Sequence, residues 1–365
     1  MKSKEKVVEI LQKAGVTING PKPTDIQIRD ERVWNRVIGG GSLALGETFM
    51  EGMWDVEDLA GLVDLVYRAR VYQDLVSFDA LPLIIRGIFQ NLQSRARSFG
   101  VAHAHYDLGN DLYTKMLDAR MVYTSGIWDG VDTLEAAQEQ KLERLCSRIG
   151  LESGDRVLDI GCGWGSFMKY AAERHGASTT GLTVSVGQTE LAKEMCAGLP
   201  VEFVIADYRD YTNTEKFDHV VSIEMIEAVG AKNLRTYFQK AHSLLKPDGL
   251  FGLQAIMGLD PKPVPDVWID RYIFPNGILP SLNQIEKAIR GLFVIESLEN
   301  YADDYDKTLM EWWKRFDASY KTLKAENPKY DEIFYRMWKF YLQGCAGLFR
   351  ADEVQVCQII LRPVH

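Results

Sequence analysis

The sequence predicts an α/β fold built on a doubly wound parallel sheet, with a small, mainly helical domain before it. Three observations support this prediction. Helical and strand-like segments alternate from about residue 133, the first strand of that series ends in a glycine-rich turn, and short helices and loops precede it. Strands that are separated by helices need crossover connections, which put helices on both faces of a parallel sheet.

The composition excludes several classes of protein. Hydrophobic residues make up 46% and aromatic residues 11% of the 365 residues, which is enough for a full core. The formal net charge of -9 argues against nucleic acid as the main partner, because phosphate binding needs a basic surface. The five cysteines are odd in number and show no CxxC spacing, which indicates a reducing compartment. Charged residues interrupt any signal-like apolar run at the N-terminus, and no uncharged stretch reaches the roughly 18–20 residues that span a bilayer. We therefore expect a cytoplasmic protein.

The N-terminal region is expected to form the smaller domain, which we bound at residues 1–95, with 96–365 as the larger one. Residues 81–99 read LPLIIRGIFQNLQSRARSF and place apolar side chains at helical spacing, with three arginines and no acid. This pattern is typical of a helix that lies on an anionic bilayer surface. A linker helix packed on its own protein remains the alternative.

The alternating series begins with an amphipathic helix over residues 134–151. The elements expected after it are a strand at 155–163, a helix at 166–176, a strand at 177–185, a helix at 187–198, strands at 201–208 and 217–224, a helix at 235–246, and a strand at 250–256 after a Pro-Asp-Gly turn. The tail from residue 301 is expected to be mostly helical. Its aromatic residues are expected in the core, namely Trp312, Trp313, Phe316, Phe334, Trp338 and Tyr341.

The turn VLDIGCGWGSF, residues 157–167, indicates a nucleoside ligand of a particular kind. It lacks the G-x-G-x-x-G spacing, no acid follows the next strand, and there is no Walker lysine, which disfavours a dinucleotide or a nucleoside triphosphate. A nucleoside with a short charged tail remains. Asp159 can meet an ammonium group of that tail, and Asp207 and Tyr208 can offer a carboxylate and a ring to an adenine. These features predict S-adenosylmethionine.

Six segments resemble the cyclopropane-fatty-acyl-phospholipid synthases, relatives of the mycolic acid cyclopropane synthases. The resemblance extends over almost the entire chain, and the segments that carry it are GSLALGETFMEGMW, HYDLGNDLY, VLDIGCGWGS, ADYRD, YIFPNGILPS and YADDYDKTLMEWW. The resemblance implies a class I methyltransferase domain with a Rossmann-like sheet and helical insertions, a lipid-contacting domain over residues 1–95, and a homodimer. The cofactor contacts that it implies are Tyr123, Thr124, Asp159, Gly161, Cys162, Gly163, Gly165, Thr183, Gln188, Asp207 and Tyr208.

The resemblance also implies a reaction. A one-carbon unit passes from S-adenosylmethionine to the cis double bond of an unsaturated phospholipid acyl chain, at the inner face of the membrane, where the protein is peripheral. A carbocation forms, and a bound bicarbonate removes a proton so that a cyclopropane ring closes. The residues that would hold this bicarbonate are Ser125, Glu227, Gln254, the backbone amide of Ile256, and Tyr305. Cys345 matches a cysteine sometimes regarded as catalytic in the family, although a small buried thiol in a helix is the alternative interpretation.

The chain departs from the family pattern at two of the five bicarbonate positions and at one residue next to a third. Ser125 stands where the family usually has cysteine, Gln254 where it usually has histidine, and Ala228 where a histidine commonly follows the glutamate. Serine and glutamine still donate hydrogen bonds to an anion, but an imidazole that could shuttle protons is lost. Deprotonation elsewhere would give a methyl- or methylene-branched chain instead of a ring.

Two further functions stay open. Plant alkaloid N-methyltransferases share this ancestry, so a small-molecule N-methyltransferase is one alternative, and a non-catalytic lipid- or cofactor-binding relative is another. The N-terminal domain and the basic amphipathic segment favour a lipid substrate. His103 and His105 form an H-x-H pattern without a third ligand cluster, so we expect structural hydrogen bonds there and no metal site.

Overall fold

The structure is a computed structural model, and it describes residues 2–71, 93, 109–261 and 265–364. The amphipathic segment at 81–99, apart from residue 93, and the two histidines of the H-x-H pattern lie outside the described residues. The chain forms two compact units. Unit 1 comprises Met1–Gln90, Pro263–Pro275 and Tyr305–Val354, and unit 2 comprises Asn91–Lys262, Asn276–Asp304 and Gln355–His365.

The division into units differs from a single boundary at residue 95. The first segment of unit 1 ends close to that position, but residues 305–354, expected in the larger domain, group with unit 1. The reason is long-range packing, since helix α14 (Glu332–Arg350) contacts both α2 (Val33–Met50) and α3 (Leu59–Arg68). Contacts between helices so far apart in the sequence cannot be predicted from local sequence patterns.

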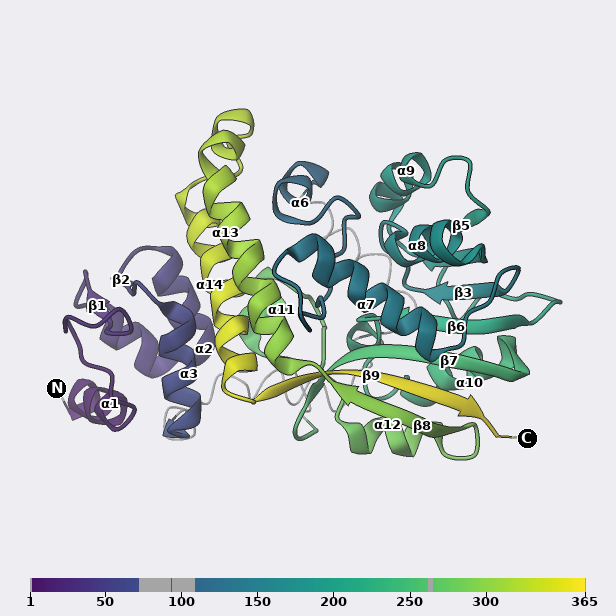
Figure 1. Ribbon diagram of the computed structural model, residues 1–365. Coiled ribbons are helices and arrows are strands. Elements are labelled where there is room, and N and C mark those ends of the chain that lie inside the picture. The colour runs from purple at the N-terminus through teal and green to yellow at the C-terminus, as the bar shows by residue number, and fades with distance from the viewer. Residues whose placement is uncertain (1, 72–92, 94–108, 262–264, 365) are drawn as a thin grey trace. The chain divides into compact units, whose positions relative to one another are not determined.

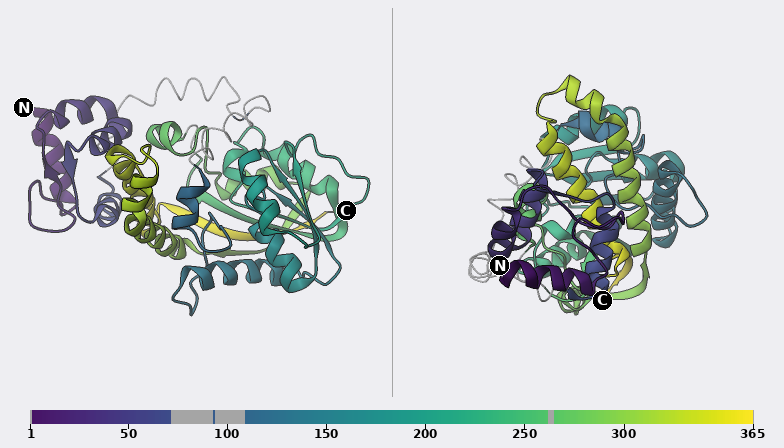
Figure 2. Two further views of the ribbon diagram at one scale, coloured as in Figure 1. Left: turned by 90° about the horizontal axis from the view of Figure 1, so that it is seen from above. Right: turned by 90° about the vertical axis from the view of Figure 1, so that its left-hand side faces the viewer.

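Unit 1 is mainly helical, as expected (Figures 1 and 2). Besides α2, α3 and α14, its elements are α1 (Lys2–Lys13), β1 (Gln27–Ile28), β2 (Trp54–Asp55), α11 (Val267–Tyr272) and most of α13 (Ala302–Glu326). The two short strands pair antiparallel. The core role expected for the six aromatic residues of the tail is confirmed for all but the half-buried Trp313, because the other five are buried.

Unit 2 contains a seven-stranded sheet with the order β5-β4-β3-β6-β7-β9-β8 (Figure 1). Its strands are β3 (Arg156–Ile160), β4 (Ser178–Thr183), β5 (Val201–Ile205), β6 (Phe217–Ile223), β7 (Leu245–Gly258), β8 (Phe293–Asn300) and β9 (Val354–Pro363). The strands β3 to β7 pair in parallel, which confirms the predicted parallel sheet. The strand order reverses between β3 and β6, and in open α/β sheets ligands bind at such a switch point, beyond the carboxyl ends of the strands.

Two features of the sheet correct the sequence-based expectation. β8 and β9 pair antiparallel and were not predicted, and β9 interrupts a tail that was expected to be mostly helical. In addition, β7 begins at Leu245, before the Pro-Asp-Gly turn. The register between β6 and β7 shifts between Phe217 and His219, so the turn residues form an irregularity within the strand.

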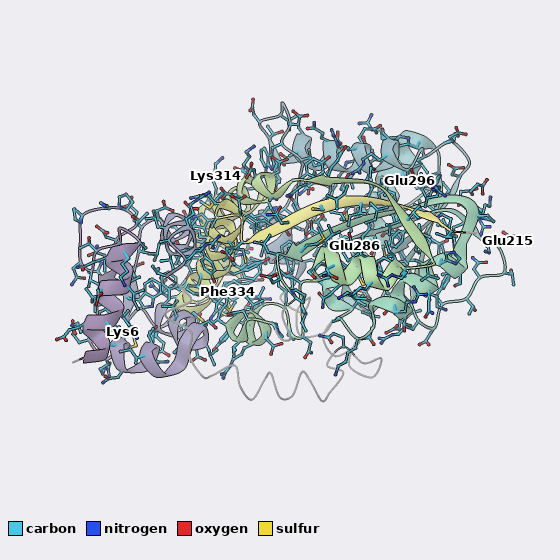
Figure 3. The ribbon with its side chains drawn as sticks, turned by 90° about the horizontal axis from the view of Figure 1, so that it is seen from below. Lys6, Glu215, Glu286, Glu296, Lys314 and Phe334 are labelled. Carbon is cyan, nitrogen blue, oxygen red and sulfur yellow. The ribbon has the colours of Figure 1, made fainter. Side chains whose placement is uncertain are left out.

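Helices cover both faces of this sheet. They are α6 (Asn110–Met116), α7 (Leu134–Arg148), α8 (Ser166–His175), α9 (Val186–Met195), α10 (Leu234–Leu244) and α12 (Leu282–Ile289), with a short 3₁₀ helix, η3 (Ile226–Ala228). Several begin at side-chain caps, such as Thr133 before α7 and Ser281 before α12, where a capping box with Gln284 forms. The exposed surface of unit 2 carries charge, as Glu286 on α12 and Glu296 on β8 show in Figure 3.

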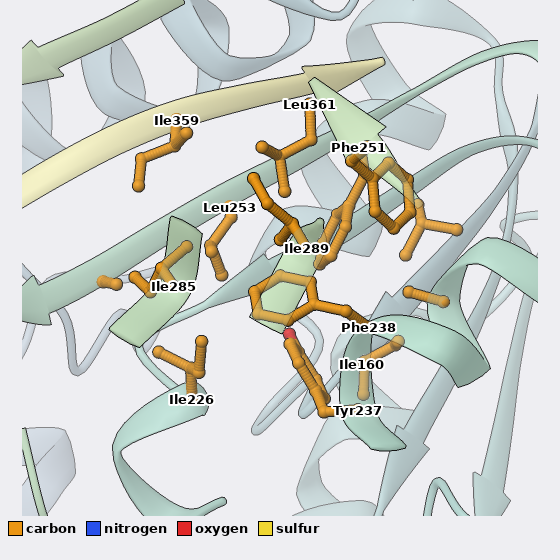
Figure 4. Close-up of a cluster of buried hydrophobic side chains, with 14 of the residues drawn as sticks. Ile160, Ile226, Tyr237, Phe238, Phe251, Leu253, Ile285, Ile289, Ile359 and Leu361 are labelled. Atoms are coloured by element: carbon orange, nitrogen blue, oxygen red, sulfur yellow. The ribbon is translucent and has the colours of Figure 1, made fainter. Parts of the chain in front are cut away.

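The apolar core of unit 2 lies on both faces of the sheet. α7 and α8 pack on one face, and α10 and α12 on the other. Figure 4 shows the second face, where Phe238, Ile289 and Leu361 meet across α10, α12 and β9. Burying a side chain of this size contributes about 1.5–3 kcal/mol. This core fixes the strand ends that carry the site.

Candidate active site

The glycine turn after β3 brings backbone close to the end of β6. Gly161 has a φ of 90° and Gly165 has a φ of 76°, and residues other than glycine rarely adopt such positive values. A Cβ atom on Gly161 would lie 2.4 Å from Met225 Cγ, and one on Gly165 would lie 2.6 Å from Phe203 Cζ. The amides of Gly161 and Cys162 both donate to the Leu182 carbonyl on β4. Only glycine fits at these two positions, so the turn lies tightly against its neighbours.

Asp159 in β3 is a buried carboxylate beside this turn. Its exposed fraction is 3%, and within the described residues no ion pair or side-chain hydrogen bond engages it. Burial raises the pKa of Asp159 to about 7, against the opposing effect of Lys141. A buried carboxylate is costly without a partner, and a ligand ammonium group would offset that cost. Asp159 therefore fits the charged tail of S-adenosylmethionine.

The segment with Tyr123 and Thr124 is held by α7. The Lys141 ammonium donates to Thr124 Oγ1, and Gln138 Nε2 donates to the Thr124 carbonyl at 2.8 Å. Lys141 is completely buried, and burial lowers its pKa to about 8, while Glu224, Asp118 and Asp159 act in the opposite direction. Sequence reasoning missed Gln138 and Lys141. The available signal was their i, i+3 spacing on the apolar face of the helix.

The other expected cofactor residues lie where β4 and β5 end. Thr183 Oγ1 accepts a hydrogen bond from the Ser185 amide, and Ser185 caps α9 by accepting from the Gln188 amide. The Asp207 carboxylate takes hydrogen bonds from Arg209, including 2.7 Å from Nε and 2.6 Å from Nη2. Arg209 orients this carboxylate, and sequence reasoning missed it although it belongs to the ADYRD motif.

Tyr208, next to Asp207, offers a ring and an unpaired hydroxyl. Its ring lies against Tyr237 with centroids 5.5 Å apart. Its hydroxyl is buried without a hydrogen-bond partner within the described residues. The expected cofactor residues at Asp159, Gly161–Gly165, Thr183 and Asp207 thus lie at the carboxyl ends of β3, β4 and β5, on one edge of the sheet.

A chain of three polar side chains runs from the end of β6 across β7 to β9. Glu224 has a φ of 50°, and its Oε1 accepts from the Ser125 amide at 3.0 Å and from Gln254 Nε2 at 2.8 Å. Gln254 Oε1 in turn accepts from Gln358 Nε2 at 3.0 Å. A left-handed backbone at a residue other than glycine costs roughly 1–2 kcal/mol, and such strain is concentrated at functional sites.

Glu227, in η3, lies next to this chain. Its Oε1 accepts a hydrogen bond from the Ile256 amide at 2.5 Å. Its Oε2 is buried and has no hydrogen-bond partner within the described residues. Burial, and then the charge of Glu224, raise the pKa of Glu227 to about 8.

The residues expected to hold bicarbonate in unit 2 come together, but most of their donors are engaged within the protein. Gln254 gives one of the two N–H groups of its amide to Glu224, and Ile256 gives its backbone N–H to Glu227. The Ser125 hydroxyl donates to the Gly126 carbonyl at 3.0 Å. An anion would meet one remaining N–H of Gln254 next to two carboxylates, so these residues of unit 2, as arranged, fit a bicarbonate poorly.

Tyr305 and Cys345 belong to unit 1. The Tyr305 ring is buried, with its centroid 4.5 Å from that of Phe349. Burial raises the pKa of the Cys345 thiol to about 12, which disfavours a thiolate nucleophile and fits the packing interpretation. In the described part of the chain, no group of three histidine, cysteine, aspartate or glutamate residues could hold a metal ion. None of the described helices is both long and apolar enough to cross a membrane.

Comparisons with known proteins agree on one family. The model of the mycolic acid cyclopropane synthetase family matches residues 93–359. A curated cyclopropane-fatty-acyl-phospholipid synthase of Escherichia coli is 43% identical over 354 residues, covering 96% of this chain and 91% of that protein. A tuberculostearic acid methyltransferase of Mycobacterium tuberculosis is 32% identical, and the alignment covers 90% of this chain and 81% of that protein. The crystal structure of a mycolic acid cyclopropane synthase complexed with SAH and CTAB superposes with a TM-score of 0.67 at 29% identity, covering 72% of this chain and 98% of that one.

Proposed function

The chain belongs to the mycolic acid cyclopropane synthetase family and is an S-adenosylmethionine-dependent methyltransferase, and on that premise we propose that it cyclopropanates unsaturated phospholipid acyl chains. A one-carbon unit is added across the cis double bond of a lipid in a bilayer. The observation that carries this proposal is the buried Glu227 carboxylate beside the glycine turn, at the switch point of the sheet. It puts a proton acceptor where the methyl donor is expected to bind.

The residues of unit 2 have distinct tasks in this reaction. When bound, S-adenosylmethionine supplies an electrophilic methyl group. Asp159 receives the ammonium group, Asp207 and Tyr208 receive the adenine, and the glycine turn admits the ligand close to the backbone. An alkene is a weak nucleophile, so holding it in line with the methyl group is the main requirement. Positioning of this kind lowers a barrier by about 7–11 kcal/mol.

Ring closure then needs a base. Methyl transfer leaves a cationic carbon on the acyl chain, and removal of one proton from the new methyl group lets the C–H electrons form the third ring bond. The family resemblance implies a bicarbonate as this base, with Tyr305 among its ligands. Because the Ile256 amide and one of the two N–H groups of Gln254 are engaged by protein carboxylates, no step is assigned to a bicarbonate here.

The wider setting is part of the same proposal. We propose that residues 1–95 contact lipid, that the protein acts as a homodimer, and that it works as a peripheral protein at the cytoplasmic face of the membrane. The support is the full-length similarity to the bacterial phospholipid synthase together with the basic amphipathic pattern at residues 81–99. A second product, a methyl- or methylene-branched chain without a ring, is favoured by the similarity to the mycobacterial methyltransferase.

The test is product analysis on defined vesicles. The purified protein is incubated with S-adenosylmethionine and vesicles of a mono-unsaturated phospholipid, with vesicles of its saturated counterpart as the control. Mass spectrometry is expected to show the gain of one CH₂ only in the unsaturated lipid, and proton NMR to show cyclopropane methylene signals. Terminal-alkene signals would establish the branched product instead. Binding of S-adenosylmethionine without any S-adenosylhomocysteine formed would establish the non-catalytic alternative.

A further inference from the structure

The hydrogen bonds around Gln254 leave one N–H of its side chain for an external anion. One N–H of Nε2 donates to Glu224, and Oε1 accepts from Gln358. An anion that met the second N–H would lie close to the Glu224 carboxylate, whose Oε1 accepts from the same Nε2 and from the Ser125 amide. The arrangement thus supplies donors to a protein carboxylate in the place where the family resemblance expects a bound ion.

Glu227 offers the acceptor that the reaction needs. Its Oε2 is buried and lacks a hydrogen-bond partner within the described residues. The other oxygen is fixed by the Ile256 amide, which orients the carboxylate. The Glu227 backbone is fixed as well, because its carbonyl accepts from the Ile278 amide at 2.9 Å. An oriented carboxylate with one bare oxygen is equipped to receive a proton.

The position of Glu227 in the fold agrees with that role. η3 directly follows β6, and Met225, which precedes η3, lies against the glycine turn after β3. Glu227 therefore lies at the switch point where the nucleoside and its methyl group are expected. Gln254 and Ile256 are two residues apart on β7, so their side chains face the same side of the sheet.

The neighbouring carboxylate Glu224 completes the arrangement. Two N–H donors solvate it, whereas the reacting oxygen of Glu227 has none. Two carboxylates in such different environments divide the roles of charge and proton carrier between them. Glu224 keeps its hydrogen bonds, and Glu227 changes protonation state.

We infer that Glu227 is itself the base of ring closure and that Glu224, held by Gln254 and Ser125, is its positioning partner. The inference rests on the proposed function. In the step, a C–H bond of the transferred methyl group breaks and its electron pair forms the C–C bond to the cationic carbon. The proton goes to Glu227 Oε2, which becomes a neutral carboxylic acid and returns the proton to solvent after product release. No bicarbonate takes part.

The first test removes bicarbonate from the wild-type protein. Turnover of mono-unsaturated phospholipid vesicles is measured in buffer freed of carbon dioxide and again with added sodium bicarbonate. The inference expects the two rates to agree within a factor of two. A rate that collapses without bicarbonate and returns with it would overturn the inference while leaving the proposed function intact. A wild-type protein that never turns over the lipid would overturn both.

The second test changes the base while keeping its shape. Glu227→Gln retains an oxygen for the Ile256 amide, so we expect binding of S-adenosylhomocysteine within twofold of the wild type and at least a hundredfold loss of cyclopropane formation. The matched control is Glu286→Gln, an exposed glutamate on α12 (Figure 3), which should keep the wild-type rate. Near-normal cyclopropane formation by Glu227→Gln would contradict the inference. If that variant does not fold, the bicarbonate test on the wild type still decides.

The third test is a pH profile that separates chemistry from structure. The titratable groups that face Glu227 are Glu224, three residues earlier, and Tyr237 on α10, while Lys141 on α7 acts on Glu224. The base must be ionised, so single-turnover ring closure should rise with pH and level off above about 8, where Glu227 titrates. Because the charge of Glu224 raises the pKa of Glu227, Glu224→Gln should move this inflection to lower pH. An inflection that does not move would contradict the assigned partnership.

Discussion

At the scale of single residues, the site depends on two carboxylates that burial makes hard to ionise. Asp159 and Glu227 have pKa values raised to about 7 and about 8, in both cases mainly by burial. For an acid, a raised folded-state pKa means that the folded protein binds a proton more tightly than the unfolded chain. The stability of the protein therefore falls as the pH rises from the ordinary pKa of the acid to its folded-state pKa, by about 1.4 kcal/mol for each pKa unit. Function, rather than stability, explains why such groups are present.

The Asp159→Asn variant tests whether this buried carboxylate lowers stability but favours cofactor binding. It removes the charge but keeps the shape, so we expect the ligand-free variant to melt several degrees higher than the wild type at pH 8 and to lose this advantage near pH 4. Its affinity for S-adenosylmethionine should fall at least tenfold, because the ammonium group loses its carboxylate. Calorimetry measures both quantities. The exposed Asp132→Asn is the control and should change neither, whereas undiminished affinity in Asp159→Asn would contradict the assigned contact.

At the scale of the element, the glycine turn shows how much local sequence can reveal. The helices and parallel strands between residues 134 and 256 are confirmed, with bounds shifted by a few residues, because period and turn residues specify them locally. The residues expected to contact the cofactor lie at strand ends for the same reason. The hydrogen bonds of Gln254 with Glu224 and Gln358 could not be predicted. Gln358 lies on β9, which pairs with strands far away in the sequence and belongs to a tail for which the sequence predicts mostly helices.

Two alanine substitutions in the turn distinguish packing from backbone conformation. Gly161 and Gly163 both have positive φ angles, 90° and 53°, but a Cβ on Gly161 meets Met225 while one on Gly163 meets nothing within 4 Å. We expect Gly163→Ala to cost about 1–2 kcal/mol of unfolding free energy. Gly161→Ala should cost clearly more and should also weaken S-adenosylmethionine binding. Urea titration followed by calorimetry compares the two, and equal losses would show that the close approach to Met225 is unimportant.

At the scale of the whole molecule, each unit is assembled from segments that lie far apart along the chain. Unit 1 joins its N-terminal helices to α14, and unit 2 takes β9 from the same C-terminal region. Hydrophobic periodicity predicted that these late segments are buried, as the aromatic residues of α13 and α14 confirm. It did not predict the partner of each segment, because partner choice depends on shape complementarity between distant surfaces.

Helix α14 offers a test of the contact that assembles unit 1. A Cβ on Gly347 would lie 2.5 Å from the Ala60 carbonyl oxygen and 2.6 Å from Val63 Cβ on α3, whereas a Cβ on Gly344 would meet only Leu59 Cδ2, at 3.9 Å. We expect Gly344→Ala to raise the unfolding free energy by up to about 1 kcal/mol, through its better helix propensity. Gly347→Ala should lower it, since backbone on α3 must move. Denaturant unfolding of the two variants gives the answer, and a stabilising Gly347→Ala would mean that α3 and α14 do not pack this closely.

The place of β9 in the sheet has a consequence for biosynthesis. β9 lies between β7 and β8 and is translated after every other strand of the sheet. Until the ribosome has delivered it, β7 presents an open edge and β8 lacks its hydrogen-bonded neighbour, a state that invites pairing with other chains. A translation product that stops before Gln358 would lack most of β9 and the hydrogen bond from Gln358 to Gln254, so the position of Gln254 depends on the last part of the chain to be synthesised.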